Sequence, residues 1–302
     1  MTLLVAGTIP AGAGETICGP VGRDEAGRLT VAGAPLPVCQ GSSAMLSAAL
    51  AVTDYLGVEP PTALLGGDIG RGEGTRAVYG RLRAEFESRK PAVVAFHYVQ
   101  PIMALMRDAI DWLAPMAAVG SVRLVADAGG MYAAKAAGLA RHFDLMTPDV
   151  GEVGFLADER ATHPAYVSHY LFGSASFDPV EFARLSYENG GASRVLLIKG
   201  ATDRIAEAGV VCETIDSPCV PQLEAIGGTG DTITGLASAF MGAGFPTFEA
   251  AVCAARANRA AGLAMGARPD QRAEDLVAAL PAVFAENLCQ WAGVCRAAEE
   301  SA

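Results

Sequence analysis

Residues Gly227–Gly235 read Gly-Gly-Thr-Gly-Asp-Thr-Ile-Thr-Gly, and this stretch decides how the chain is interpreted. Three glycines fall within four positions, so the backbone can turn sharply and approach a ligand without a Cβ in the way. An apolar, helix-compatible run follows. If a helix begins near Asp231, its free N–H groups and the positive end of its dipole face the loop and form a site for a phosphate group. Asp231 then lies where a hydroxyl group needs a base.

The same pattern has a simpler interpretation. Aspartate before a helix is often only an N-cap, and glycines often only form a turn. No Gly-Lys-Ser/Thr follows the loop, so it is not a P-loop, and it is not a Gly-x-Gly-x-x-Gly loop after a first strand. The rest of the chain has to decide between a phosphate site and a turn.

Composition narrows the class of protein. The chain has 302 residues, of which 51% are hydrophobic and 18% charged, so we expect a large buried core and little disorder. The net charge of −11 argues against a nucleic-acid partner. No apolar stretch of about 18 residues occurs, so we expect no membrane segment. Seven scattered cysteines predict reduced thiols in a cytoplasmic protein.

Strand-like and helix-like segments alternate along the chain. Short apolar runs are predicted as strands at Leu3–Ala6, Ala92–Phe96, Val122–Ala126 and Arg194–Ile198. Longer stretches are predicted as helices at Ser43–Leu56, Thr75–Glu87, Met103–Ala117, Ala133–Arg141 and Thr232–Gly242. Apolar strands between helices indicate a doubly wound α/β fold, with a mostly parallel sheet covered on both faces. We predict one domain over 1–302, with a small flap at 8–37 and an insertion at 161–178.

The loops after the predicted strands carry the polar residues. In a parallel sheet, ligands gather at the carboxyl ends of the strands, so these loops should lie along one edge. They contain His97, Asp127, the Thr147–Glu152 segment, Lys199 with Gly200, and the loop that begins at Gly227. The sequence therefore predicts a polar site at this edge.

The order of these loops resembles the ribokinase-like superfamily, and within it most closely the NAD(P)H-hydrate dehydratases. That family is similar in three motifs, Thr-Pro-x-x-Gly-Glu, Leu-x-Lys-Gly-Ala and Gly-Gly-x-Gly-Asp, here Thr147–Glu152, Leu197–Ala201 and Gly227–Asp231. The match covers residues 120–265. Asp149 stands where the family loop usually has His. The segment around Gly67 and Asp68 is similar instead to a Gly-Asp-x-x-Gly segment of sugar kinases.

The resemblance implies a reaction and its cofactors. A nucleotide, ATP or ADP, phosphorylates a hydroxyl of the hydrate with Mg²⁺, and elimination of phosphate follows. Asp231 would be the base. Glu152 would hold the metal, mostly through water. The nucleotide would be bound by Lys199, Gly200, Gly227, Gly228, Thr229, Gly230 and Asn258.

The substrate residues and the activity keep alternatives open. Residues expected to contact the substrate are His97, Asp127, Asp149, Gly67 and Asp68, and each also has a structural interpretation, as a cap, a loop residue or a core histidine. A kinase for a sugar or a vitamin-like alcohol would share the same site. A non-catalytic nucleotide-binding regulator would retain the glycine loop. The family resemblance also implies a homo-oligomer.

Overall fold

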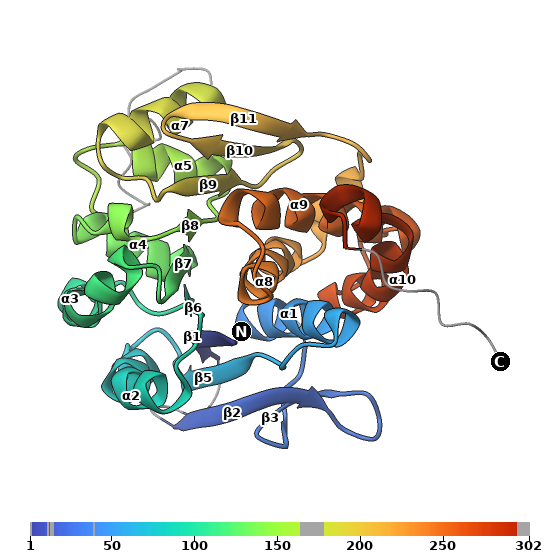
Figure 1. Ribbon diagram of the computed structural model, residues 1–302, viewed down its shortest axis with the longest axis horizontal. Coiled ribbons are helices and arrows are strands. Elements are labelled where there is room, and N and C mark those ends of the chain that lie inside the picture. Colours follow the sequence, from blue (N-terminus) through green and yellow to red (C-terminus); the bar gives the residue numbers. More distant parts are fainter. Residues whose placement is uncertain (1, 11, 13–14, 39, 164–177, 295–302) are drawn as a thin grey trace.

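The computed structural model describes residues 2–10, 12, 15–38, 40–163 and 178–294, and within them one sheet of eleven strands forms the centre of the protein (Figure 1). The strand order is β11-β10-β9-β8-β7-β6-β1-β5-β2-β3-β4. The strands are β1 (Leu3–Ile9), β2 (Thr16–Arg23), β3 (Leu29–Val31), β4 (Ala34–Pro35), β5 (Thr62–Gly67), β6 (Val93–His97), β7 (Arg123–Asp127), β8 (Leu145–Met146), β9 (Val195–Ile198), β10 (Asp203–Glu207) and β11 (Val210–Ile215).

The middle of the sheet is parallel and its two edges are antiparallel. Strands β5, β1, β6, β7, β8 and β9 all run in the same direction. At one edge β10 and β11 pair in the opposite sense, and at the other edge β2, β3 and β4 do so. The prediction of a mostly parallel, doubly wound sheet is therefore confirmed. Because these six strands run in the same direction, their carboxyl ends lie on the same side of the sheet.

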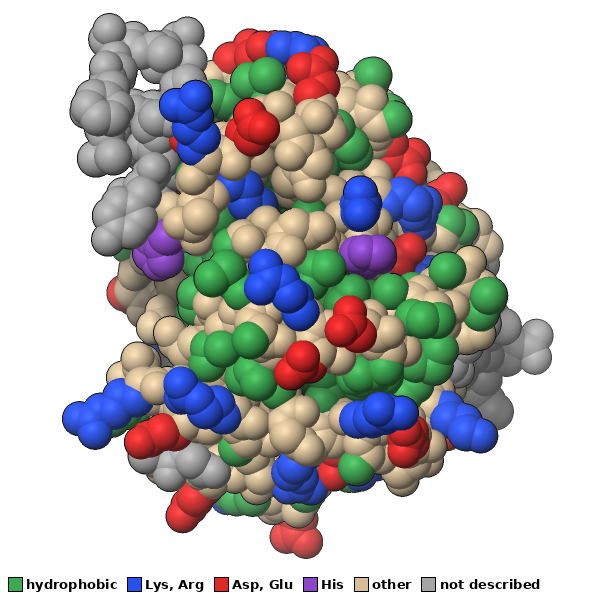
Figure 2. Space-filling view, turned by 90° about the vertical axis from the view of Figure 1, so that its left-hand side faces the viewer, with side chains coloured by type: hydrophobic (Ala, Val, Ile, Leu, Met, Phe, Trp, Pro, Cys, Tyr) green, Lys and Arg blue, Asp and Glu red, His purple; other side chains and the backbone are tan. Residues whose placement is uncertain are grey.

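Helices cover both faces of the sheet. They are α1 (Ser42–Leu56), α2 (Glu73–Arg89), α3 (Met103–Ala118), α4 (Ala128–Ala136), α5 (Val150–Ala157), α7 (Pro179–Glu188), α8 (Thr229–Gly242), α9 (Thr247–Ala264) and α10 (Ala273–Ala292). The helices α1, α8, α9 and α10 form one apolar core with the sheet. The helices α2, α3, α4, α5 and α7 form a second core on the other face. Figure 2 shows the side of the molecule that carries this second set of helices, where acidic and basic side chains lie side by side.

The structure differs from the predicted elements in two places, and part of a third lies outside the described residues. The helix predicted at Ala133–Arg141 begins earlier, because α4 follows β7 directly, and only a 3-10 turn occupies Ala140–His142. Part of the 8–37 stretch forms β2, β3 and β4, which continue the sheet. Of the 161–178 insertion, residues 164–177 lie outside the described residues.

The described cysteines include both free thiols and a disulfide-bonded residue. Among the described residues, the free thiols are Cys18, Cys212, Cys219 and Cys253. Cys289 is disulfide-bonded, so the prediction of reduced thiols is wrong for this residue.

Among the helices of the described residues, none is both long and apolar enough to cross a membrane.

Close packing of α1 against α8 positions the start of α8. Gly235 lies on the α8 face that meets α1, and a Cβ at this position would come within 2.1 Å of the Met45 carbonyl oxygen. No side chain fits in that space, so glycine is required at Gly235 if the two helices are to stay this close. The contact fixes the helix that carries Asp231 against the helix that begins at Ser42.

We predict that Gly235→Ala lowers the free energy of unfolding by about 1–3 kcal/mol, because the extra methyl group forces α1 and α8 apart. Gly80→Ala is the matched control, since Gly80 is exposed in α2 and a Cβ there meets nothing within 4 Å. The control should raise the free energy of unfolding by about 0.5–1 kcal/mol. Chemical denaturation measures both changes, and equal stability of Gly235→Ala and the wild type would contradict the prediction.

Candidate functional site

The site lies at the carboxyl ends of the parallel strands. His97 is the last residue of β6 and Asp127 the last of β7, and the two are direct neighbours in the parallel register. Lys199 follows β9. The first turn of α8 brings Asp231 to the same place, 3.2 Å from His97. These residues are far apart in the sequence and were predicted to meet at the carboxyl ends of the strands. In the structure they lie close together.

Asp231 is not an N-cap. The N-cap of α8 is Gly228, whose φ of 93° lies in the left-handed region that favours glycine, and Asp231 is the third residue of the helix. Its Oδ2 accepts a hydrogen bond of 2.6 Å from the Gly41 N–H, and its Oδ1 lies 3.2 Å from His97 Nε2. Asp231 is buried, with 9% of its surface exposed. This carboxylate is thus held in a defined position beside the loop.

The start of α8 offers N–H groups to an anion. The first turn of a helix leaves N–H groups without an acceptor inside the helix. Within the described part of the chain, no hydrogen bond uses the N–H groups of Thr229, Gly230 or Asp231. A Cβ on Gly230 would lie 3.7 Å from Lys199 Nζ, so the cation is next to this turn. The residues therefore fit a phosphate group, which requires N–H donors and positive charge.

Thr229 and Asn258, which were predicted to bind nucleotide, form hydrogen bonds that stabilise the start of α8. The Thr229 hydroxyl donates to the carbonyl oxygens of Leu223 and Ile226, each at 3.1 Å. Asn258 Oδ1 accepts a 2.6 Å hydrogen bond from the Thr232 hydroxyl, and Asn258 Nδ2 donates to the Thr229 carbonyl at 3.3 Å. Asn258 is buried, so it holds α9 to the first turn of α8. Its binding of nucleotide stays a prediction.

Lys199 and Asp127 form a buried ion pair under the loop. Lys199 Nζ lies 3.1 Å from Oδ1 and 3.0 Å from Oδ2 of Asp127. Thr234 donates to the same carboxylate at 2.5 Å and is itself 2.9 Å from Thr147 Oγ1. Burial alone would lower the pKa of Lys199, but the carboxylates of Asp127, Glu152 and Asp231 raise it above its ordinary value. Lys199 therefore remains charged at neutral pH.

Glu152 and Asp149 close the first turn of α5. Asp149 is the N-cap and accepts from the Glu152 N–H at 2.7 Å, while Glu152 accepts from the Asp149 N–H at 2.8 Å. The Tyr132 hydroxyl donates to the other Glu152 oxygen. Burial raises the pKa of Glu152 to about 7, and Asp127 and Asp149 add to the shift while Lys199 opposes it. The structure shows the capping arrangement of Asp149 and Glu152. The predicted roles of Glu152 in metal binding and of Asp149 in substrate binding stay predictions.

Gly200 belongs to a loop held by a buried ion pair. The Gly200 N–H donates to Asp203 at 3.0 Å, and Asp203 pairs with Arg259 at 2.7 Å. Arg259 also donates to the carbonyl oxygens of Gly200 and Ala201, each at 2.9 Å. The strand-end loop that carries Lys199 is therefore fastened to α9.

Asp68 holds the turn between β5 and α2. It is 7% exposed and accepts hydrogen bonds from the N–H groups of Gly70, Arg71, Gly72 and Thr75 and from the Thr75 hydroxyl. At Gly74, a Cβ would come within 2.4 Å of the Gly67 carbonyl oxygen, so β5 and α2 meet without a side chain between them. These contacts give Gly67 and Asp68 a structural task, and their contact with substrate stays a prediction.

Several residues of the site were not expected from the sequence. Gly41 binds Asp231, Ser42 binds His97, Thr234 binds Asp127 and Tyr132 binds Glu152. The Gly-Ser-Ser sequence at Gly41 and Ser42 signals the start of a helix, because glycine and serine are common at helix N-termini, but it does not signal their contacts with Asp231 and His97. Thr234 lies within the quoted motif, where its position one helical turn after Gly230 was the signal.

A metal ion does not explain the central cluster best. His97, Asp127 and Asp231 each offer one ligand atom, and these atoms lie within 4.8 Å of one another. The ammonium group of Lys199 already supplies a positive charge 3.0 Å from Asp127 Oδ2. The charge of Asp127 in this cluster is therefore balanced by a residue of the chain itself.

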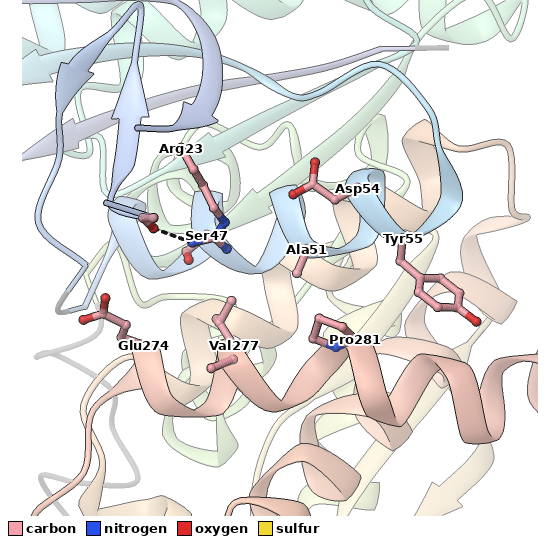
Figure 3. A pocket seen from close by; sticks show the side chains of 10 residues that line it. Arg23, Ser47, Ala51, Asp54, Tyr55, Glu274, Val277 and Pro281 are labelled. Carbon is pink, nitrogen blue, oxygen red and sulfur yellow. Dashed lines mark hydrogen bonds between the residues drawn. The ribbon is translucent and has the colours of Figure 1, made fainter. Parts of the chain in front are cut away.

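Two hollows lie away from this cluster. One of about 520 Å³ is lined by residues of α1 and α10 together with Arg23 (Figure 3), and one of about 500 Å³ lies beside α9 and α10. Neither is lined by Asp231, Lys199 or His97.

Comparison with solved structures defines the fold class as ribokinase-like. Pyridoxal kinase from Lactobacillus plantarum matches with a TM-score of 0.53 at 16% identity, over 95% of this chain and 98% of that one. Pyridoxal kinase from Staphylococcus aureus, in complex with AMP-PCP and pyridoxal, matches with a TM-score of 0.51 at 13% identity, over 86% of each chain. A putative kinase from Bacillus subtilis matches with a TM-score of 0.51 at 15% identity, over 94% of this chain and 91% of that one.

The sequence comparisons then give the family. The model described as NAD(P)H-hydrate dehydratase matches residues 106–281, more than half of the chain, and the chain belongs to this family. An uncharacterized protein of Methanocaldococcus jannaschii is 32% identical over 246 residues, which are 81% of this chain and all of that protein. The resemblance inferred from the motifs is confirmed.

We predict that Asp68→Asn lowers the free energy of unfolding at pH 7 by about 1–3 kcal/mol, since an amide group would face the N–H of Thr75. Burial alone would raise the pKa of Asp68, but its hydrogen bonds from Thr75, Gly72 and Gly70 hold the pKa below the ordinary value. The stabilisation is therefore present above the ordinary pKa of an aspartate and is lost as the pH falls through the lower folded-state pKa.

Urea titrations at pH 7 and at acidic pH measure the difference between Asp68→Asn and the wild type, which should shrink on acidification. Asp270→Asn is the control, because Asp270 is an exposed residue with a surface ion pair to Arg268. A difference that is absent at pH 7, or that grows as the pH falls, would show that the Asp68 carboxylate does not hold this turn.

Proposed function

We propose that the protein is a nucleotide-dependent NAD(P)H-hydrate dehydratase, which phosphorylates the hydroxyl of the hydrate and then eliminates phosphate. The observation that carries the proposal is the position of the Asp231 carboxylate. It lies in the first helical turn of α8, beside N–H groups that have no acceptor among the described residues and close to the charged Lys199. Membership of the family supports the choice of reaction.

In the proposed reaction, the start of α8, Lys199 and Asp231 have separate roles. Bound ATP or ADP supplies the phosphoryl group, and Mg²⁺ neutralises part of its charge. The N–H groups of Thr229 and Gly230 and the ammonium group of Lys199 bind the transferred phosphoryl group. Asp231 accepts the proton of the substrate hydroxyl. Binding of nucleotide by a protein of this fold is supported by the AMP-PCP complex of the Staphylococcus aureus kinase.

Glu152 fits a magnesium site that works through water. One of its oxygens accepts from Tyr132 and the other from the Asp149 N–H, and its raised pKa of about 7 makes it readily protonated. A cation nearby would replace that proton. Magnesium retains several of its waters and takes only one or two carboxylates directly, so water-mediated contact suits this crowded carboxylate.

A small-molecule kinase is the second candidate. The solved structures of similar fold include kinases for pyridoxal. In addition, Asp149 occupies the position where the dehydratase loop usually has His, and its side chain caps α5. A kinase would use the same base and the same anion site and would end the reaction with the phosphorylated product.

One assay separates the two candidates. NADH hydrate is supplied with ATP and, separately, with ADP, and the recovery of NADH absorbance is followed. Recovery with either nucleotide supports the dehydratase. Absence of recovery with both, together with nucleotide consumption in the presence of pyridoxal or a sugar, would replace it by the kinase.

We predict that Asp231→Asn lowers turnover by about 100-fold or more and leaves nucleotide affinity within about twofold, because a general base acts in the transition state and not in nucleotide binding. Steady-state kinetics and calorimetric titration with nucleotide measure the two quantities. Full activity in the folded variant would eliminate Asp231 as the base.

We predict that Gly228→Ala weakens nucleotide binding, since its φ of 93° is strained for a residue with a Cβ and the N–H groups of the loop would move. Gly266→Ala is the matched control, because Gly266 also has a positive φ, of 59°, and a Cβ there meets nothing within 4 Å. Both variants should lose about 1–2 kcal/mol of stability. Only Gly228→Ala should raise the dissociation constant for nucleotide, and an equal constant in both variants would refute the anion site.

A further inference from the structure

We propose that His97 receives the proton that Asp231 takes from the substrate hydroxyl, so that Asp231 is free to act as base a second time. This inference rests on the proposed dehydratase function and concerns its second half, the elimination. It assigns His97 as a positioning residue that works through Asp231. Three features carry it: the hydrogen bonds of His97, the charges around it, and the number of protons that the reaction removes.

The hydrogen bonds fix which ring nitrogen is free. The Ser42 hydroxyl donates its single hydrogen to the Thr8 carbonyl oxygen at 2.9 Å. His97 Nδ1 lies 3.1 Å from the same Ser42 oxygen and must therefore be the donor in that contact. In the neutral imidazole, Nε2 then carries the lone pair. Nε2 is buried and forms no hydrogen bond with any described residue, which agrees with this tautomer.

Two carboxylates lie beside Nε2. Nε2 lies 3.2 Å from Asp231 Oδ1 and 3.8 Å from Asp127 Oδ2. At this distance a proton can pass directly between Asp231 and Nε2, and once shared between them it makes the contact attractive. Lys199 balances the charge of Asp127 at 3.0 Å, so the charge of Asp231 remains for His97. The remaining neighbours of the ring, Ser42 and Tyr98, carry no charge at neutral pH.

The reaction removes two protons from the substrate. In the first half the O–H bond breaks, the oxygen forms a bond to the terminal phosphorus of the nucleotide, and the shortened nucleotide leaves with the electron pair of the broken P–O bond. In the second half the C6–O bond breaks and its electron pair leaves with the phosphate, while the C5–H bond breaks and its electron pair forms the C5–C6 double bond. A single carboxylate cannot hold both protons.

The position of His97 decides its part in this sequence. Its side chain is fully buried, so it does not touch the substrate, and Asp231 lies between it and the loop. The hydroxyl proton passes from Asp231 to Nε2, which forms the N–H bond as the O–H bond on Asp231 breaks. Asp231 is again a carboxylate and accepts the C5 proton. Both protons return to solvent through Asp231 after the products leave.

The test is a single-turnover experiment with His97→Gln, since glutamine can still hydrogen-bond to Ser42 but cannot take up a proton. Nucleotide labelled in its terminal phosphoryl group, NADH hydrate and excess enzyme are mixed, and phosphorylated hydrate, free phosphate and NADH absorbance are followed. We expect phosphorylation within about threefold of the wild-type rate and elimination slowed by about 100-fold, so that phosphorylated hydrate accumulates. His142→Gln, the same change outside the site, should behave as the wild type.

Each outcome decides the proposal. Wild-type elimination in folded His97→Gln would overturn it, and so would equal slowing of both halves, which would give His97 a merely structural role. If the wild type itself produces no NADH, the proposed function fails, and that result does not depend on any His97 variant. If His97→Gln does not fold, Ser42→Ala replaces it, because release of Nδ1 should also slow the elimination more than the phosphorylation.

A second measurement does not depend on activity. In the wild-type protein without substrate, ¹⁵N NMR of the neutral His97 imidazole should show a protonated Nδ1 and an unprotonated Nε2. Ser42→Ala should alter the Nδ1 signal. An Nε2-protonated neutral imidazole in the wild type would contradict the assignment.

Discussion

The hydrogen bond from the Gly41 N–H to Asp231 is the interaction on which the site depends. It joins the residue before α1 to the first turn of α8 over a distance of 2.6 Å. The bond is possible only because α1 and α8 lie in close contact, and a glycine at Gly235 allows that contact beneath Met45. Packing in the core thereby sets the direction of a single carboxylate at the edge of the sheet.

A balance of buried charges is the second constraint. Lys199 is a charged group surrounded by the carboxylates of Asp127, Glu152 and Asp231. Removing Lys199 would leave the buried Asp127 carboxylate without the lysine's positive charge, which costs more than the ion pair itself contributes. The same lysine lies next to Gly230, so the group that balances the acidic cluster also lies beside the proposed phosphate site. An acidic protein can in this way retain one local site for an anion.

The sequence predicted those parts of the site that follow the rules of a parallel sheet. His97 and Asp127 end their strands and Lys199 follows one, so their meeting at the carboxyl ends of the strands could be expected. The contact of Gly41 with Asp231 could not, because a backbone N–H has no sequence signature and its partner lies 190 residues away. The early start of α4 was missed for a local reason, since Ala128 adopts a φ of 47°, a conformation that alanine rarely takes.

The dehydratase and the kinase reactions differ in what happens after phosphoryl transfer. Both activities need one base and one anion site, and Asp231 with the first turn of α8 supplies these in either case. The elimination needs in addition a place for a second proton that stays out of water. Within the described structure, a buried imidazole nitrogen without a hydrogen-bond partner lies 3.2 Å from the base. In the proposed dehydratase, this nitrogen takes up the first proton, so that Asp231 can accept the second.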